Sequence, residues 1–102
     1  MNYISKGDLI MNKARRTRID NVSSKLEEIM ALIEELQAEV EDIRDEEQEC
    51  FDNLTEGLQA TERGQKMEEA VSALEDVISS MEDATAAVES AVDSLDEAKV
   101  EW

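Results

Sequence analysis

The sequence predicts an all-α protein in which two long coiled-coil-like helices form an antiparallel hairpin, and hairpins assemble into an oligomeric helical bundle. Three observations predict this. Apolar residues recur at alternating steps of three and four in both halves of the 102-residue chain, proline is absent, and glutamate-rich faces border both apolar runs. Such steps keep one face of a helix against a partner. The length allows one domain at most.

We expect residues 1–12 to be an N-terminal extension and residues 13–52 to form the first helix. Its apolar residues follow a heptad spacing, which predicts the seam that packs against the second helix. The seam contains Ile19, Val22, Leu26, Ile29, Ile33, Leu36, Val40 and Ile43, and continues through Glu47 and Cys50 to Phe51 and Leu54. The intervening glutamates are good helix formers and would make the solvated face.

Residues 53–61 are expected to be the connecting loop. Asn53 is a plausible end of the first helix, and Gly57 breaks the spacing of both halves. Thr61 is the predicted N-cap of the second helix. Gly64 follows early in that helix, where a glycine is unfavourable by roughly 1 kcal/mol, so we expect it to permit a close contact.

The second helix is expected over residues 62–100. Its seam is Met67, Val71, Leu74, Ile78, Met81, Thr85, Val88, Val92, Leu95, Lys99 and Trp102. A second row follows at seven-residue intervals: Ala70, Val77, Ala84, Ala91 and Ala98. Small residues let another backbone approach closely. The helix therefore has an apolar face wide enough for two neighbours, which predicts a homo-oligomer, a dimer or larger.

The charge is unevenly distributed. Residues 1–25 hold six basic and two acidic side chains, whereas the rest of the chain holds 4 basic and 25 acidic ones, for a total of −17. One interpretation is mutual neutralisation, because the basic start of the first helix and Asp96, Glu97 and Glu101 at the end of the second are neighbours in a hairpin.

The alternative is an anion site. Stepping back along the seam from Ile19 reaches Arg15 and then Asn12, so in an oligomer several guanidinium groups would gather around a phosphate. The candidate anion-binding residues are Lys13, Arg15, Arg16 and Arg18 from the helix, and Asn53, Gln59 and Arg63 from the loop end. Direct DNA binding is disfavoured, because the acidic remainder would repel a duplex.

Several chemistries lack their residues. Without histidine and with one cysteine, the chain cannot supply zinc fingers, Ser-His-Asp triads or a disulfide framework. A calcium loop starting at Asp52 fails because Arg63 stands where a bidentate Glu belongs. Glu47 is expected to reach Lys66 or Arg63 across the hairpin, and Cys50 to be a small core residue. We therefore expect no enzyme, no metal and no cofactor.

Three segments resemble small, largely uncharacterised helical proteins encoded by bacteriophages and mobile elements. They are Met11-Asn12-Lys13-Ala14-Arg15-Arg16, then Asp45-Glu46-Glu47-Gln48-Glu49, then the stretch from Phe51-Asp52-Asn53 through Leu58-Gln59 and Glu62-Arg63-Gly64 to Met67-Glu68-Glu69-Ala70. In that group the chain opens at the position of Met11, and Thr55 departs from its pattern, where a proline is expected. The resemblance covers about residues 11–80 and implies a viral protein that acts by binding.

Together these observations favour a non-catalytic phage-type accessory protein in the host cytoplasm. It would sequester an anionic small molecule, such as a cyclic nucleotide defence signal. Two alternatives stay open: an acidic DNA mimic that occupies a basic host protein, and a structural coiled coil without a ligand. No apolar run reaches the ~20 residues that span a membrane, so a soluble intracellular protein is expected.

Overall fold

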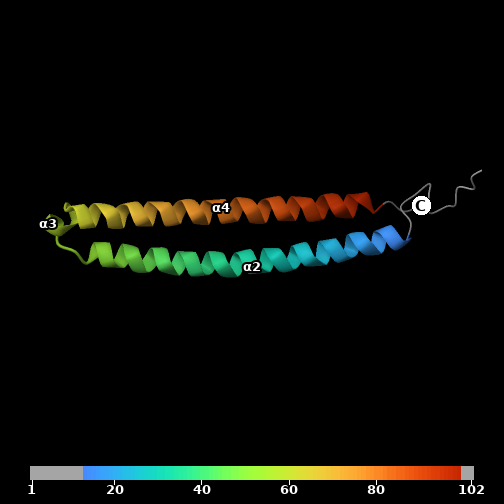
Figure 1. The fold of residues 1–102 in the computed structure, drawn as a ribbon, viewed down its shortest axis with the longest axis horizontal. Helices are drawn as coiled ribbons and strands as arrows, with labels where there is room; N and C mark the ends of the chain where they lie inside the picture. Colours follow the sequence, from blue (N-terminus) through green and yellow to red (C-terminus); the bar gives the residue numbers. More distant parts are fainter. Residues whose placement is uncertain (1–12, 100–102) are drawn as a thin grey trace, which may run out of the picture. The chain divides into compact units, whose positions relative to one another are not determined.

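The computed structural model describes residues 13–99, and its elements are the helices α2 (Lys13–Asp52), α3 (Glu56–Gln59) and α4 (Glu62–Ala98). Within that range no strand is found, which confirms the all-helical class. Figure 1 shows the three helices in chain order, with α3 at the turn between the two long ones. The expected extension over residues 1–12, and the seam positions Asn12 and Trp102, lie outside the described residues.

The end of α2 is closed by local hydrogen bonds. The Gln48 side-chain amide donates to the Asp52 carboxylate at 2.9 Å, and the Asn53 N–H donates to the Glu49 carbonyl at 3.0 Å. The Leu54 N–H then donates to the Phe51 carbonyl at 3.0 Å, a tighter turn that does not continue the helix. The last carbonyls of α2 thus find partners where the chain turns.

Part of the segment expected to be a loop is helical. Thr55 caps α3, because its hydroxyl accepts a hydrogen bond from the Leu58 N–H at 3.3 Å. Gly57 lies inside this helix and does not break it. The Thr61 hydroxyl accepts a hydrogen bond from the Gly64 N–H at 3.4 Å, which is the contact expected of an N-cap of α4.

Gly64 is buried against the backbone of the turn. A Cβ atom on this residue would lie 2.7 Å from the carbonyl carbon and 2.8 Å from the Cα atom of Gln59, with the carbonyl oxygen closer still. The Gln59 side chain holds the turn from the other side, since its Nε2 donates to the Phe51 carbonyl at 3.1 Å. The predicted close contact at Gly64 is confirmed, and its neighbour is backbone.

The long helices contribute to two compact units. Unit 1 contains the described residues 13–32 and 85–99, and unit 2 is Ile33–Ala84. In each unit a segment of α2 runs antiparallel to a segment of α4 (Figure 1). An ion pair between Lys99 and Asp20 joins the two segments of unit 1, and the turn containing α3 joins those of unit 2.

The seam of α4 faces α2 as predicted. Val71 and Ile78, at 6% and 7% exposure, are the buried apolar residues of the described chain, and Gly64 is buried with them. The seam positions from Met67 to Leu95 are otherwise half-buried. Among residues 13–99, Val71 and Ile78 are the only two buried apolar side chains, and neither is completely removed from water.

The seam of α2 is partly wrong. Its first row is as predicted and half-buried: Ile19, Leu26, Ile33, Val40 and Glu47. Phe51 and Leu54, the predicted end of the seam, are also half-buried. The second row that faces α4 is Ser23, Met30, Gln37, Arg44 and Phe51, one residue later than the predicted Val22, Ile29, Leu36, Ile43 and Cys50. All five predicted members of that row are exposed, Cys50 as a free thiol. Both choices keep steps of three and four, so the spacing allows either.

Candidate functional site

The basic end of unit 1 is the most electropositive part of the described chain. Residues 13–18 at the start of α2 include four basic side chains, and the first turn contains no acidic one. Backbone N–H groups at a helix N-terminus add a partial positive charge. Side chains and helix dipole therefore favour an anion at this end.

The side chains of this end line two different hollows of unit 1. A polar hollow is lined by Lys13, Arg16, Thr17, Asp20, Asp96 and Lys99. A second hollow is lined by Arg15, Arg18, Ile19, Val22 and Leu95. The candidate residues from α2 are thus divided into two pairs: Lys13 with Arg16, and Arg15 with Arg18.

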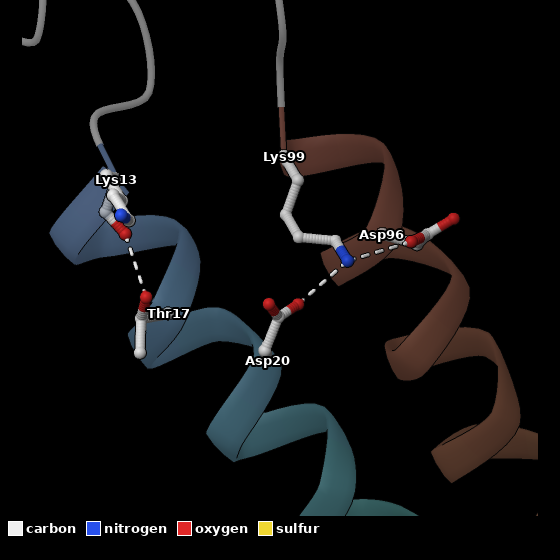
Figure 2. Close-up of polar contacts among 5 residues, drawn as sticks. All are labelled: Lys13, Thr17, Asp20, Asp96 and Lys99. Atoms are coloured by element: carbon white, nitrogen blue, oxygen red, sulfur yellow. Dashed lines mark hydrogen bonds and ion pairs between the residues drawn. The ribbon is translucent and has the colours of Figure 1, made fainter.

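Lys99 organises the wall of the polar hollow. Its ammonium group lies 2.8 Å from the Asp20 carboxylate on α2 and 3.3 Å from the Asp96 carboxylate on α4 (Figure 2). The hydrogen bonds to Asp20 and Asp96 raise the pKa of Lys99 above its usual value. The ammonium is therefore charged at neutral pH and held by two carboxylates.

The lining of the polar hollow is net positive. It has three cations, Lys13, Arg16 and Lys99, and two carboxylates, which gives a charge of +1. Thr17 adds a hydroxyl, which donates to the Lys13 carbonyl at 3.0 Å (Figure 2) and can still accept a hydrogen bond. Two cations and a hydroxyl suit an oxyanion such as a phosphate.

The candidate residues from the loop end all lie in unit 2. The Gln59 side chain is engaged in the turn through the Phe51 carbonyl, and Asn53 is exposed just after α2. Arg63 lines a hollow with Glu47, Glu62, Lys66 and Met67. Gln59 therefore has a structural role in the turn.

The expected pairing of Glu47 with Lys66 is replaced in part by a local contact. The Lys66 ammonium lies 3.3 Å from the Glu62 carboxylate, one turn earlier on α4. Glu47 is half-buried in the internal seam and lines the same hollow as Lys66 and Arg63. These contacts mix both charges, so this hollow is a weaker anion site than the basic end.

Sequence reasoning missed Thr17, Asp20 and Lys99 as parts of one site. Lys99 carried a signal, because it continues the apolar seam of α4 as a charged residue. Asp20 carried none, since it is one acid among 27. The expected meeting of the basic start of α2 with the acidic end of α4 is seen at Asp96, which lines the same hollow as Lys13 and Arg16. The Lys99–Asp20 pair adds a contact of the opposite sense, with the cation beyond α4 and the carboxylate on α2.

Other classes of site find no support. No group of three or more potential metal ligands exists within residues 13–99. Among the described helices, none is long and apolar enough to cross a membrane. No match was found among protein-family models, curated proteins or solved structures. The site is therefore interpreted from its own chemistry.

Proposed function

We propose that this chain is a non-catalytic phage-type accessory protein that sequesters a phosphate-bearing small molecule, such as a cyclic nucleotide defence signal, in the host cell. The observation that supports the proposal most directly is the pair of cations Lys13 and Arg16 beside Thr17 in the polar hollow. Arg16 would bind a phosphate in a bidentate manner, and Lys13 would add a point charge.

Stoichiometric binding fits this site better than catalysis. The polar hollow contains no thiol or imidazole, and its one hydroxyl has no neighbouring general base other than carboxylates engaged with Lys99. Sequestration requires only affinity and enough protein to match the ligand. The cations and the hydroxyl of the polar hollow are sufficient for such binding.

The carboxylates of the hollow make the proposal testable in both directions. Lys13→Ala/Arg16→Ala should weaken binding by roughly tenfold or more, because a hydrogen bond to a charged group contributes about 1.5–3 kcal/mol. Asp20→Asn should strengthen binding, since it removes a negative charge from the lining. Lys25→Ala, which removes a cation outside the hollow, is the matched control and should have little effect.

The experiment is isothermal titration calorimetry with a panel of cyclic dinucleotides and cyclic trinucleotides, and with inorganic phosphate as the reference anion. Affinity should decrease as salt increases, because the contacts are ionic. The proposal fails if no nucleotide releases or absorbs heat. It also fails if Lys13→Ala/Arg16→Ala binds as the wild type does.

One observation favours a second function, imitation of DNA. Residues 39–52 hold eight acidic side chains and one basic one along the last turns of α2. Such a surface would attract a basic nucleic-acid-binding host protein. A salt-sensitive host partner that binds equally well to Lys13→Ala/Arg16→Ala would favour this function over nucleotide binding.

A further inference from the structure

A second heptad seam runs along α2 beside the internal one. It uses the same alternation of three and four but lies outside the contact with α4. We call it the outer seam. Its members are Arg15, Arg18, Val22, Lys25, Ile29, Leu32, Leu36, Glu39, Ile43, Glu46 and Cys50. Every member is exposed.

The middle of the outer seam is apolar. Val22, Ile29, Leu36 and Ile43 are between 43% and 48% exposed, and Leu32 between them is 52% exposed. These five are most of the large apolar residues that the described chain leaves in water. Steps of three and four predict burial against another helix, and α4 already occupies the internal seam. Within residues 13–99 no helix covers the outer seam, although its spacing predicts one.

Helix α4 offers a matching surface on the same side of each unit. Its exposed row is made of small residues at the same alternation: Ala70, Ala73, Val77, Ser80, Ala84, Ala87, Ala91 and Ser94. In both helices each member of the exposed row comes one residue before a member of the internal seam. Because the two helix segments are antiparallel, the two exposed rows lie on the same side of the pair. In unit 2, Val77 and Ala84 line a shallow hollow with Ile33. Small residues there allow another backbone to come close.

The charges of the outer seam identify the occupant. Cations occupy its N-terminal part (Arg15, Arg18 and Lys25), and acids occupy its C-terminal part (Glu39 and Glu46). Ile29, Leu32 and Leu36 lie between these charges, and the row from Val22 to Ile43 is centred on the middle of α2. A row that is apolar in the centre, basic at one end and acidic at the other complements itself when reversed.

We propose that a second copy of this chain packs antiparallel along the outer seam of α2, forming a two-fold symmetric dimer. In this register Val22 lies opposite the partner's Ile43, and Ile29 lies opposite the partner's Leu36. Offset by one residue from that register, Lys25 lies near the partner's Glu39, and Arg18 lies near the partner's Glu46. Unit 1 of one copy thereby packs on unit 2 of the other, with opposite charges at both ends.

A parallel dimer is disfavoured by the same residues. It would place Lys25 against the partner's Lys25 and Glu39 against the partner's Glu39, and like charges across a seam destabilise the pairing. The antiparallel dimer leaves the polar hollow uncovered, because that hollow is lined by Lys13, Arg16 and Thr17, none of which belongs to the outer seam. Dimer and anion site can therefore coexist.

Charge reversal tests the register. Lys25→Glu and Glu39→Lys should each weaken the dimer about tenfold or more, because two-fold symmetry repeats each like-charge contact. An equimolar mixture of the two variants should restore dimers of wild-type stability, and so should the double variant Lys25→Glu/Glu39→Lys. Glu34→Lys makes the same charge change on the other side of α2 and should leave the dimer intact.

The measurement is sedimentation equilibrium over a range of protein concentrations, with circular dichroism to show that each variant is folded. A wild-type chain that stays monomeric at all concentrations would overturn the proposal. So would single variants that dimerise like Glu34→Lys, which is also the result expected of a parallel dimer. Failure of the mixture to restore dimers would overturn the proposed register.

Discussion

Replacing Gly64 with alanine tests the packing of the turn against α4. In an exposed helix position this change would stabilise the protein by about 1 kcal/mol. Here the added Cβ would stand 2.7 Å from the Gln59 carbonyl carbon and 2.8 Å from its Cα atom. Because these atoms belong to the backbone, the turn must move for the methyl group to fit.

The expected effect of Gly64→Ala is the difference between a strain cost and a propensity gain. Overpacking of this kind costs typically about 1–3 kcal/mol. Movement of Gln59 also weakens its hydrogen bond to the Phe51 carbonyl, 3.1 Å long, which contributes about 1 kcal/mol. After subtracting the helix-propensity gain, we expect a loss of about 1–3 kcal/mol in the free energy of unfolding.

Gly57→Ala is the matched control. No atom lies within 4 Å of a Cβ built at Gly57, which is also helical. This variant should therefore be as stable as the wild type or more stable by up to about 1 kcal/mol. The two substitutions are chemically identical, but they should change the free energy of unfolding in opposite directions.

The assay is urea unfolding followed by far-ultraviolet circular dichroism at one fixed protein concentration, because self-association would shift the midpoint. A Gly64→Ala variant at least as stable as the wild type would contradict the steric clash with Gln59. Equal losses of stability in both variants would also contradict it, since glycine would then matter for its conformational freedom and not for space.

Three further predictions concern other contacts. Ile78→Ala should cost about 2–5 kcal/mol in urea unfolding, because Ile78 is 7% exposed, and a loss below 1 kcal/mol would contradict its place in the core. Thr55→Ala should cost about 1 kcal/mol by removing the cap on the Leu58 N–H, whereas Thr55→Ser should retain it. The raised pKa of Lys99 implies that its stabilising contacts are complete below about pH 10.4 and are lost as pH rises through the folded pKa. In an NMR titration of the Lys99 side chain, Asp20→Asn should lower that pKa, and an unchanged titration would contradict the ion pair.

The helices and the close contact at the turn could be predicted from the sequence. The seam of α4 is unambiguous, because its core positions are apolar almost throughout. The crowding at Gly64 was also predictable, since a glycine early in a helix needs a reason. The helix α3 was missed because Gly57 suggested a break, while the cap at Thr55 decided otherwise.

The contact row of α2 could not be predicted from hydrophobicity. The row from Val22 to Ile43 is more apolar than the row that faces α4, which includes Gln37 and Arg44. These long side chains place their polar ends at the edge of the pair, where Gln37 donates to Glu41 at 3.2 Å and Arg44 to Asp45 at 2.9 Å. Their aliphatic stems remain in the seam. Choosing the contact row of α2 by its number of apolar residues therefore selects the outer seam, which does not face α4.

The positive charge of the candidate site could be predicted from the sequence. The division of its basic residues between two hollows could not. Arg15 and Arg16 are neighbours in sequence, and one residue corresponds to a rotation of about 100° around the helix. Which of the two faces the polar hollow depends on which row of α2 meets α4. The error in the seam thus extended to the site.

The distribution of buried residues has a consequence for how a ligand would act. Gly64, Val71 and Ile78 are the buried residues of the described chain, and all three belong to unit 2. Segments with few buried apolar contacts open more readily, and their amide hydrogens exchange sooner. The polar hollow is part of unit 1. An anion bound there would therefore shift the local opening equilibrium of unit 1 toward the closed state. Ligand binding would then be visible as slower amide exchange in the segments of α2 and α4 that make up unit 1.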